Sequence, residues 1–318
     1  MNRIIRTSML LALIFGITSL QLASAETRIT YRSAKSTSSY YQMGVQIAEA
    51  VKAGSGGDIL VTVEEGQGSV SNVMQVPARG ADYVFTTPPV LVKLAKAEKA
   101  MFKGKGNPAF AEIRALFPIP SLTMHFVVSE KSGIQSFGDM KGKTILLGKG
   151  SFGAKEGAKY INELGLEGEV KFAEVELSNA VSALKNGQID GFVTAGSYPA
   201  PNVVEAAASM PVRILNLGDA ERAQSKSVGK RKQLMIPAGT YEGQTADVST
   251  TTLEVVAYAT TKMSDETAYA LTRTYWEEKA KMGESNPWWN GVDKTYLKAI
   301  IGPMHPGAEK YYKEVGFM

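Results

Sequence analysis

Short runs rich in β-branched and aromatic residues alternate with helical patterns along most of the chain, and this alternation constrains the fold more than any other feature. After the first run, Tyr40, Met43, Ile47 and Val51 recur at spacings of three and four, which predicts one buried face of a helix. From Ser264 the pattern stays helical to the end of the chain. The expected strands are 28–32, 58–63, 81–85, 113–117, 122–129, 143–147, 170–175, 189–194, 212–217 and 248–260. The sequence therefore predicts an α/β protein with mixed sheets flanked by helices.

Two domains are expected, because 318 residues exceed the roughly 150 of a typical single domain. Pro118 and Pro120 separate two of the expected strands, and proline interrupts a β ladder. We place a crossing between the domains there, with hinges at 117–121 and at the ends of the run 248–260. The expected lobes are lobe I, 26–118 plus 262–318, and lobe II, 119–261.

The first 25 residues have the pattern of a secretory signal peptide. Arg3 and Arg6 precede an apolar run at 9–20, and Ala-Ser-Ala at 23–25 fits a cleavage site. An uncleaved membrane anchor is the alternative, but the run is shorter than the roughly 20 residues that span a bilayer. We therefore expect a mature protein that begins at Glu26, resides in the periplasm and has no membrane span.

Composition narrows the chemistry that the chain can perform. There is no cysteine, which excludes disulfides, thiolate metal sites and cysteine nucleophiles. Only His125 and His305 are available for imidazole chemistry, so multi-histidine metal sites and hydrolase triads are hard to build. The 35 Lys and Arg against 31 Asp and Glu leave +4, too little for a nucleic-acid-binding surface. We expect a non-enzymatic protein with no cofactor, no metal and no nucleic-acid partner.

Candidate ligand contacts lie in five loops that lead from an expected strand into a helix, where α/β folds bind ligands. Hydroxyls, an ammonium group and free backbone N–H groups at helix starts suit a polar or anionic ligand. Solvated loops that only cap their helices are the alternative. The candidates are Lys35, Ser36, Ser39 and Tyr40; Gly68, Ser69 and Asn72; Thr86 and Thr87; Lys149, Ser151, Phe152 and Gly153; and Gly196, Ser197 and Tyr198.

The fourth loop, Gly148–Gly153, matches G-x-G-x-x-G between a strand and a helix. Glu174 and Glu176 follow about 20 residues later, as in dinucleotide-binding proteins. A periplasmic dinucleotide-dependent oxidoreductase is therefore an alternative function. Export would remove the protein from the nicotinamide pool, so we favour an anion site at the helix N-terminus.

Three other features have ordinary structural interpretations. His125 lies in an apolar strand and is expected to be a buried, hydrogen-bonded sheet residue. Lys226 and the basic run 230–232 are expected to be a solvated surface. The pair Trp288-Trp289 fits either the core or an exposed partner contact.

Several motifs resemble one family of solute receptors. Residues 304–316 (MHPGAEKYYKEVG) resemble the C-terminal hallmark of TAXI-type receptors, the TRAP-associated extracytoplasmic immunogenic proteins of tripartite ATP-independent periplasmic transporters. Further similar segments are 187–192 (GQIDGF) with 196–199 (GSYP), Gly68-Ser69 with Asn72, and Tyr40-Tyr41. The resemblance implies a two-lobed periplasmic-binding-protein type II fold, ligand capture in an interlobe cleft and delivery to the TRAP membrane subunits. It also implies organic-acid or amino-acid anions, such as glutamate and 2-oxoglutarate, as ligands.

The chain departs from the family pattern at two expected ligand contacts. Residues 33–36 (SAKS) replace a glycine-rich loop, and 87–89 (TPP) replace a Gln-Ser-Asp-like segment. We therefore expect a small anionic organic solute, namely a dicarboxylate, a keto acid or an acidic amino acid, without carrying over one family ligand. Lys35 and Lys149, one in each lobe, would favour a dianion. A secreted immunogen without a ligand is the remaining alternative.

Overall fold

The computed structural model describes residues 26–148 and 151–318, and the strands of this part of the chain form one mixed sheet. The strands are β1 (Thr27–Arg32), β2 (Ile59–Glu64), β3 (Tyr83–Thr87), β4 (Ile113–Ser129), β5 (Thr144–Leu146), β6 (Lys171–Ala173), β7 (Gly191–Gly196), β8 (Val212–Ile214), β9 (Lys232–Ile236) and β10 (Val248–Thr260). Their order is β2-β1-β3-β10-β4-β7-β5-β6, with β8 on β4 and β9 on β10. The expected signal peptide, 1–25, and the candidate residue Lys149 lie outside the described residues.

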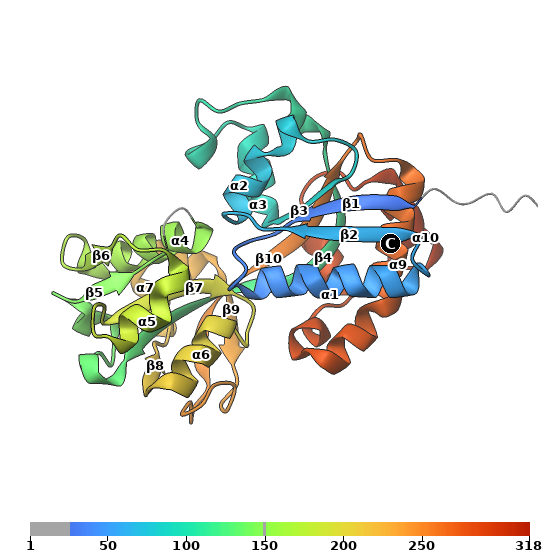
Figure 1. The fold of residues 1–318 in the computed structure, drawn as a ribbon. Coiled ribbons are helices and arrows are strands. Elements are labelled where there is room, and N and C mark those ends of the chain that lie inside the picture. The colour runs from blue at the N-terminus through green and yellow to red at the C-terminus, as the bar shows by residue number, and fades with distance from the viewer. Residues whose placement is uncertain (1–25, 149–150) are drawn as a thin grey trace, which may run out of the picture.

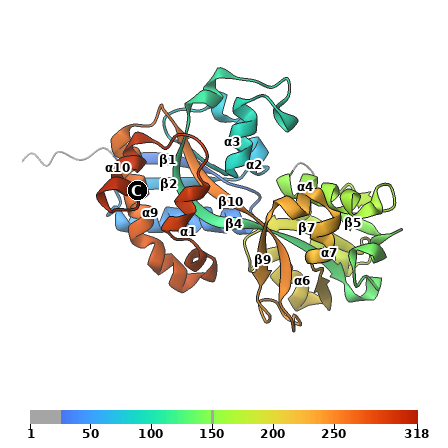
Figure 2. The same ribbon diagram turned by 180° about the vertical axis from the view of Figure 1, so that it is seen from behind.

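Figure 1 shows the elements in two groups, and β4 and β10 run through both. Lobe I contains β1 to β3 with α1 (Ser39–Gly54), α2 (Ser69–Met74), α3 (Pro89–Lys96), α9 (Asp265–Ser285) and α10 (Pro306–Glu314). Lobe II contains β5 to β9 with α4 (Phe152–Ile161), α5 (Ala180–Lys185), α6 (Pro201–Ser209), α7 (Asp219–Gln224) and α8 (Lys226–Lys230). The reverse view keeps the two groups apart (Figure 2). The α/β, two-lobed architecture predicted from the sequence is confirmed, whereas the lobe boundaries at 118 and 261 stay a prediction.

Local signals explain why α1 forms where it does. The Ser38 side chain accepts a hydrogen bond from the Tyr41 backbone N–H and caps the helix. Met43, Ile47 and Val51 are fully buried against the sheet, as their spacing predicts. In Figure 1, α1 and α9 lie on one face of the lobe I strands and α2 and α3 on the other. In the described part of the chain, no helix combines the length and apolar content needed to cross a bilayer.

The expected strand break at the prolines is wrong, because β4, which is 17 residues long, runs through both Pro118 and Pro120. Strand β7 pairs with β4 only from Thr123 onward. Within the described chain, the N–H groups that Pro118 and Pro120 lack would therefore have no β7 carbonyl to bond. A proline is tolerated in a strand where its missing donor has no ladder partner. The Pro118 carbonyl oxygen still accepts a hydrogen bond, from the Tyr275 hydroxyl at 2.7 Å.

The crossing itself is marked by an irregular register between β4 and β10. Leu253 is paired with Leu122 and Val255 with Ile119, so β4 has one extra residue in this interval. Such a bulge bends the pair locally. The irregularity lies in the middle of β10, whereas we had expected hinges at its ends.

Strand β9 is an element that the sequence pattern missed. It begins at Lys232, the last residue of the basic run, and Lys226, Lys230 and Lys232 are exposed, as expected of a solvated surface. Arg231 is the exception, because its guanidinium pairs with Glu156 at 2.7 Å in a half-buried contact. The residues of β9 gain their strand conformation by pairing with β10, a partner that follows them only later in the sequence.

The C-terminal motif has a structural role. The His305 ring lies within hydrogen-bond distance of Met263 O (3.1 Å) and of the Gly307 N–H (3.4 Å), and His305 caps α10. A Cβ on Gly307 would overlap the Asp265 carbonyl oxygen and lie 2.8 Å from the Tyr269 backbone nitrogen. The glycine therefore allows α10 to contact α9 closely.

The tryptophan pair belongs to the interior. Trp288 and Trp289 are buried, and both indole N–H groups donate to the Gln46 side chain. This joins the C-terminal segment to α1.

His125 confirms the expectation of a satisfied sheet histidine. Its ring is fully buried and lies 2.8 Å from the Tyr241 hydroxyl and 3.2 Å from the Thr123 carbonyl. Burial lowers the pKa of His125 to about 4, because the charged imidazolium loses its hydration.

We expect stability to fall as pH drops from 6.5 toward 4. In that window an unfolded histidine, with a pKa of about 6.5, binds a proton that folded His125 does not. At about 1.36 kcal/mol per pH unit, the loss is about 2 kcal/mol by pH 5. Urea unfolding at pH 7.5 and pH 5 measures it. In His125→Gln, the difference in unfolding free energy between pH 7.5 and pH 5 should be smaller by this amount. A difference as large as in the wild type would contradict the role given to His125.

Candidate functional site

A cavity of about 80 Å³ lies where the strand-to-helix loops of the two lobes meet. It is walled by lobe I residues of the first and second loops, by lobe II residues of the fourth loop and α6, and by Leu122 of β4. We call it the front cavity. Of the residues predicted from sequence, it brings together Lys35, Tyr40, Gly68, Ser69, Ser151, Phe152 and Gly153.

Two smaller hollows adjoin the front cavity. One of about 20 Å³ shares Tyr40, Gly68 and Ser69 with it and adds the predicted residues Asn72 and Thr86. The other, of about 10 Å³, shares Phe152 and Leu122 and is walled further by residues that include the ion pair of Glu156 and Arg231. The site is therefore a string of small spaces between the lobes, with polar groups from both of them.

Asn72 fixes the lobe I side of the site. Its side-chain amide donates to the carbonyl oxygens of Ser33 at 2.9 Å and Thr86 at 3.0 Å, so it ties the first loop to the end of β3. Its buried Oδ1 has no hydrogen-bond partner among the described residues. An unpartnered buried acceptor favours a ligand or water that brings a donor.

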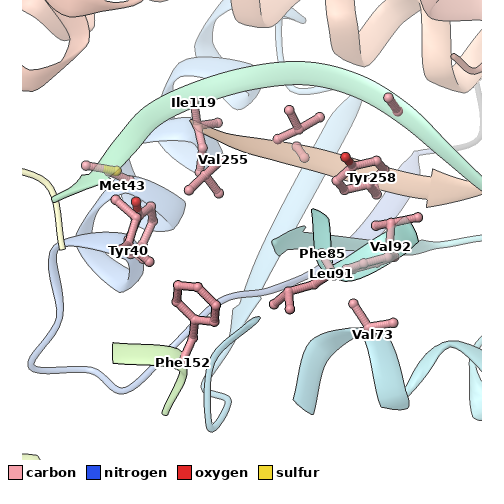
Figure 3. Packing of buried hydrophobic residues seen from close by; sticks show 14 of the residues in the cluster. Tyr40, Met43, Val73, Phe85, Leu91, Val92, Ile119, Phe152, Val255 and Tyr258 are labelled. Carbon is pink, nitrogen blue, oxygen red and sulfur yellow. The ribbon is translucent and has the colours of Figure 1, made fainter. Parts of the chain in front are cut away.

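Tyr40 and Phe152 form the aromatic part of the site. Tyr40 comes from α1 in lobe I and its hydroxyl donates to Pro120 O at 3.2 Å, which fixes the ring at the crossing. Phe152 begins α4 in lobe II and is 5% exposed. Figure 3 shows the Phe152 ring beside Tyr40, within the cluster of buried side chains that continues into lobe I. Both rings are buried where the two lobes meet, so moving the lobes apart would change the shape of the site.

The fourth loop owes two of its glycines to folding. Gly148 has φ +79°, a left-handed conformation that favours glycine. A Cβ on Gly153 would lie 2.6 Å from the Ala195 Cβ, so this glycine lets α4 approach β7. Ser151 caps α4 by accepting from the Ala154 N–H at 2.9 Å and donates to Gly148 O. Backbone conformation therefore accounts for Gly148 and helix–strand packing for Gly153.

Lys35 is the only charged side chain among the described residues that line the front cavity. It is 38% exposed, and its ammonium lies 3.6 Å from a Glu65 carboxylate oxygen. The other lining groups are hydroxyls, amides and apolar side chains, including Gln67 and Asn202. The described lining thus carries one positive charge and no carboxylate.

Six predicted residues lie elsewhere than in the front cavity or its hollows. Ser36 is exposed, and Thr87 is buried with its hydroxyl donating to Ser69 O at 3.3 Å. Ser39 and Gly196 touch at the crossing, where a Cβ on Gly196 would lie 2.7 Å from Ser39 Oγ. Tyr198 lines a separate and larger cavity.

Ser197 serves the crossing rather than the front cavity. Its N–H donates to Ser39 Oγ at 3.0 Å and its own hydroxyl donates to Ser121 O at 2.7 Å. It therefore links the end of β7 both to the start of α1 and to β4.

Sequence reasoning missed several lining residues. Gln67 belongs to the second selected loop, 66–69, and Asn202 follows the fifth, 195–199, so taking whole loops with a few flanking residues would have included both. Leu122, Leu177 and Thr194 reach the cavity from other elements, and nothing in their local sequence indicates it.

Comparison with known proteins agrees with this architecture. Residues 33–316 match the model of the NMT1-like family. The periplasmic binding protein BugD is similar over 92% of this chain and 98% of its own, at 11% identity and a TM-score of 0.56. Iron-bound HitA from Pseudomonas aeruginosa is similar over 92% and 98%, at 14% identity and a TM-score of 0.51. The chain therefore has the fold of periplasmic binding proteins, and because the family model spans most of its length, it belongs to the NMT1-like family.

Proposed function

We propose that the protein is a periplasmic solute-binding receptor that captures a small anionic organic solute in the front cavity and delivers it to a TRAP-type membrane transporter. The observation that carries this proposal is a cavity formed by both lobes and lined by Lys35 without a described carboxylate. Closing the lobes on the solute would shield it from water and present both lobes to the transporter.

The chemistry of the lining favours a carboxylate-bearing solute. Lys35 offers an ammonium, while Ser69 and Asn202 offer polar groups at helix starts. The free Oδ1 of Asn72 additionally favours a solute with a hydroxyl or amino donor. A dicarboxylate, a keto acid or an acidic amino acid carries the negative charge that would pair with Lys35. Those that also carry a hydroxyl or amino group could donate a hydrogen bond to Asn72 Oδ1.

Two lines support the transporter class and the location. The C-terminal motif resembles TAXI-type receptors, and the fold is shared with periplasmic binding proteins. The N-terminal pattern predicts export. The TRAP membrane subunits are accordingly the partners that we propose.

A thermal-shift panel tests the function. Dicarboxylates, keto acids, acidic amino acids, neutral sugars and cationic amino acids are added at equal concentration. A solute at 100 times its Kd stabilises the folded state by about 2.7 kcal/mol, which raises the unfolding temperature measurably. We expect the shift with an anion. Stabilisation by sugars or cations alone, or by no compound, would contradict the proposal.

Lys35→Ala should weaken binding of that anion about tenfold. A hydrogen bond to a charged group contributes about 1.5–3 kcal/mol, and the Glu65 pairing reduces the net effect toward the 1.4 kcal/mol that equals tenfold. Calorimetry at low and high salt measures it, and the loss should shrink at high salt through screening. Lys52→Ala, an exposed lysine in the last turn of α1, is the matched control. If the Lys35 variant and this control bind the anion with equal affinity, Lys35 does not take part in binding.

A further inference from the structure

A second and larger cavity, of about 480 Å³, lies behind the crossing of the lobes. We call it the rear cavity. Its walls include Ser121 and Thr123 of β4, Tyr198 after β7, Thr240 after β9, and Trp288 and Tyr296 of the C-terminal segment. Lobe II thus supplies Tyr198 and Thr240, while lobe I supplies Trp288 and Tyr296.

Strand alternation separates this cavity from the front cavity. Successive side chains of a strand point to opposite faces. Leu122 lines the front cavity, and its neighbours Ser121 and Thr123 line the rear cavity. At these three residues the two cavities open on opposite faces of β4. They share no described lining residue, so a solute in one does not occupy the other.

The chemistry of the rear cavity differs from that of the front. Three aromatic side chains and several prolines line it, with hydroxyl groups from Ser121, Thr123 and Thr240. No charged side chain belongs to its described lining. Its volume lies within the range of about 300–1,000 Å³ that is typical of small-molecule pockets. These properties favour an uncharged aromatic ligand. An ion would lose its hydration on entering, and the described lining has no opposite charge to compensate for that cost.

Hydrogen bonds hold the walls of the rear cavity in place. Trp288 is 9% exposed and its indole N–H donates to Gln46 Oε1 at 3.2 Å. Ser121 Oγ lies 3.4 Å from the Tyr296 hydroxyl, a long contact that joins β4 to the C-terminal segment. Side chains fixed before binding lose little freedom when a ligand arrives, which favours affinity.

We propose that the rear cavity is a second ligand site, which takes an uncharged aromatic molecule and braces the two lobes from behind. Because both lobes supply its walls, an occupant contacts both and stabilises one arrangement of them. This inference stands apart from the anion site, since it rests on other residues.

The neutral fluorophore N-phenyl-1-naphthylamine is a suitable probe, because its emission rises in apolar surroundings. Titration of the purified protein should give a saturable rise with one site. Gly291→Phe should lower the affinity at least tenfold: Gly291 lines the rear cavity, and an added Cβ there meets nothing within 4 Å. Gly138→Phe, at another exposed and uncrowded glycine in a 3-10 turn (Phe137–Met140), should stay within twofold.

Two further variants decide where the probe binds. Thr240→Trp fills the rear cavity from lobe II and should weaken binding as Gly291→Phe does, which covers the case that one of them fails to fold. Ser69→Trp fills the front cavity and should leave probe binding unchanged. The probe should also raise the unfolding temperature of the wild type but not of Gly291→Phe. No saturable binding, or binding that both rear-cavity variants retain, would overturn the inference, whatever the outcome for the anion.

Discussion

Ser69→Trp should weaken capture of the anionic solute more than a hundredfold. Ser69 lines both the front cavity and the adjoining hollow at Asn72, and an indole ring placed there fills spaces of only about 80 and 20 Å³. The solute would then have to displace the ring or bind with the lobes apart, and either route loses the contacts that closure provides. A hundredfold loss equals about 2.7 kcal/mol of binding free energy, which calorimetry resolves.

Ser71→Trp is the matched control for this substitution. Ser71 lies on the same helix, α2, two residues further on, and it lines none of the cavities described above. It should bind the solute like the wild type, and both variants should unfold at similar temperatures. Wild-type affinity in Ser69→Trp would show that the front cavity is not the capture site.

Gly307→Ala should destabilise the fold by about 3 kcal/mol. The added methyl group would overlap the Asp265 carbonyl oxygen, and it would lie 2.8 Å from the Tyr269 nitrogen, so α10 must move away from α9. Backbone atoms cannot yield as a flexible side chain can, which places this overpacking at the upper end of the usual 1–3 kcal/mol. Because the unfolding entropy of a chain of this size is about 0.6–0.7 kcal/mol/K, the midpoint of thermal unfolding falls by roughly 4–5 °C.

Gly291→Ala separates the packing effect from the general cost of replacing glycine. A Cβ at Gly291 meets nothing within 4 Å, so this variant should stay within about 0.5 kcal/mol of the wild type. If both variants unfold at the wild-type temperature, the close contact between α9 and α10 does not contribute to stability.

The candidate site was only partly predictable from the sequence. Loop position selected Lys35, Tyr40 and Phe152, and the structure brings all three to one cavity, since strand ends in this fold converge. Loop position could not show that Ser197 faces the crossing or that Tyr198 lines the rear cavity. Neighbouring residues in a loop point in different directions, and contacts with distant elements decide which direction each one takes.

The sequence by itself determined the α/β class, the buried face of α1 and the helix start after Ser38. These depend on residues within a few positions of one another, so periodicity and capping suffice to predict them. Only the tertiary structure decided that β4 passes through Pro118 and Pro120, that β9 is a strand, and that one-residue alternation at Leu122 separates two cavities. The path of β4 and the separation of the cavities depend on strands and a lobe far away in the chain, and β9 depends on pairing with the next strand, β10. A pattern within one segment contains no information about which partner will be there.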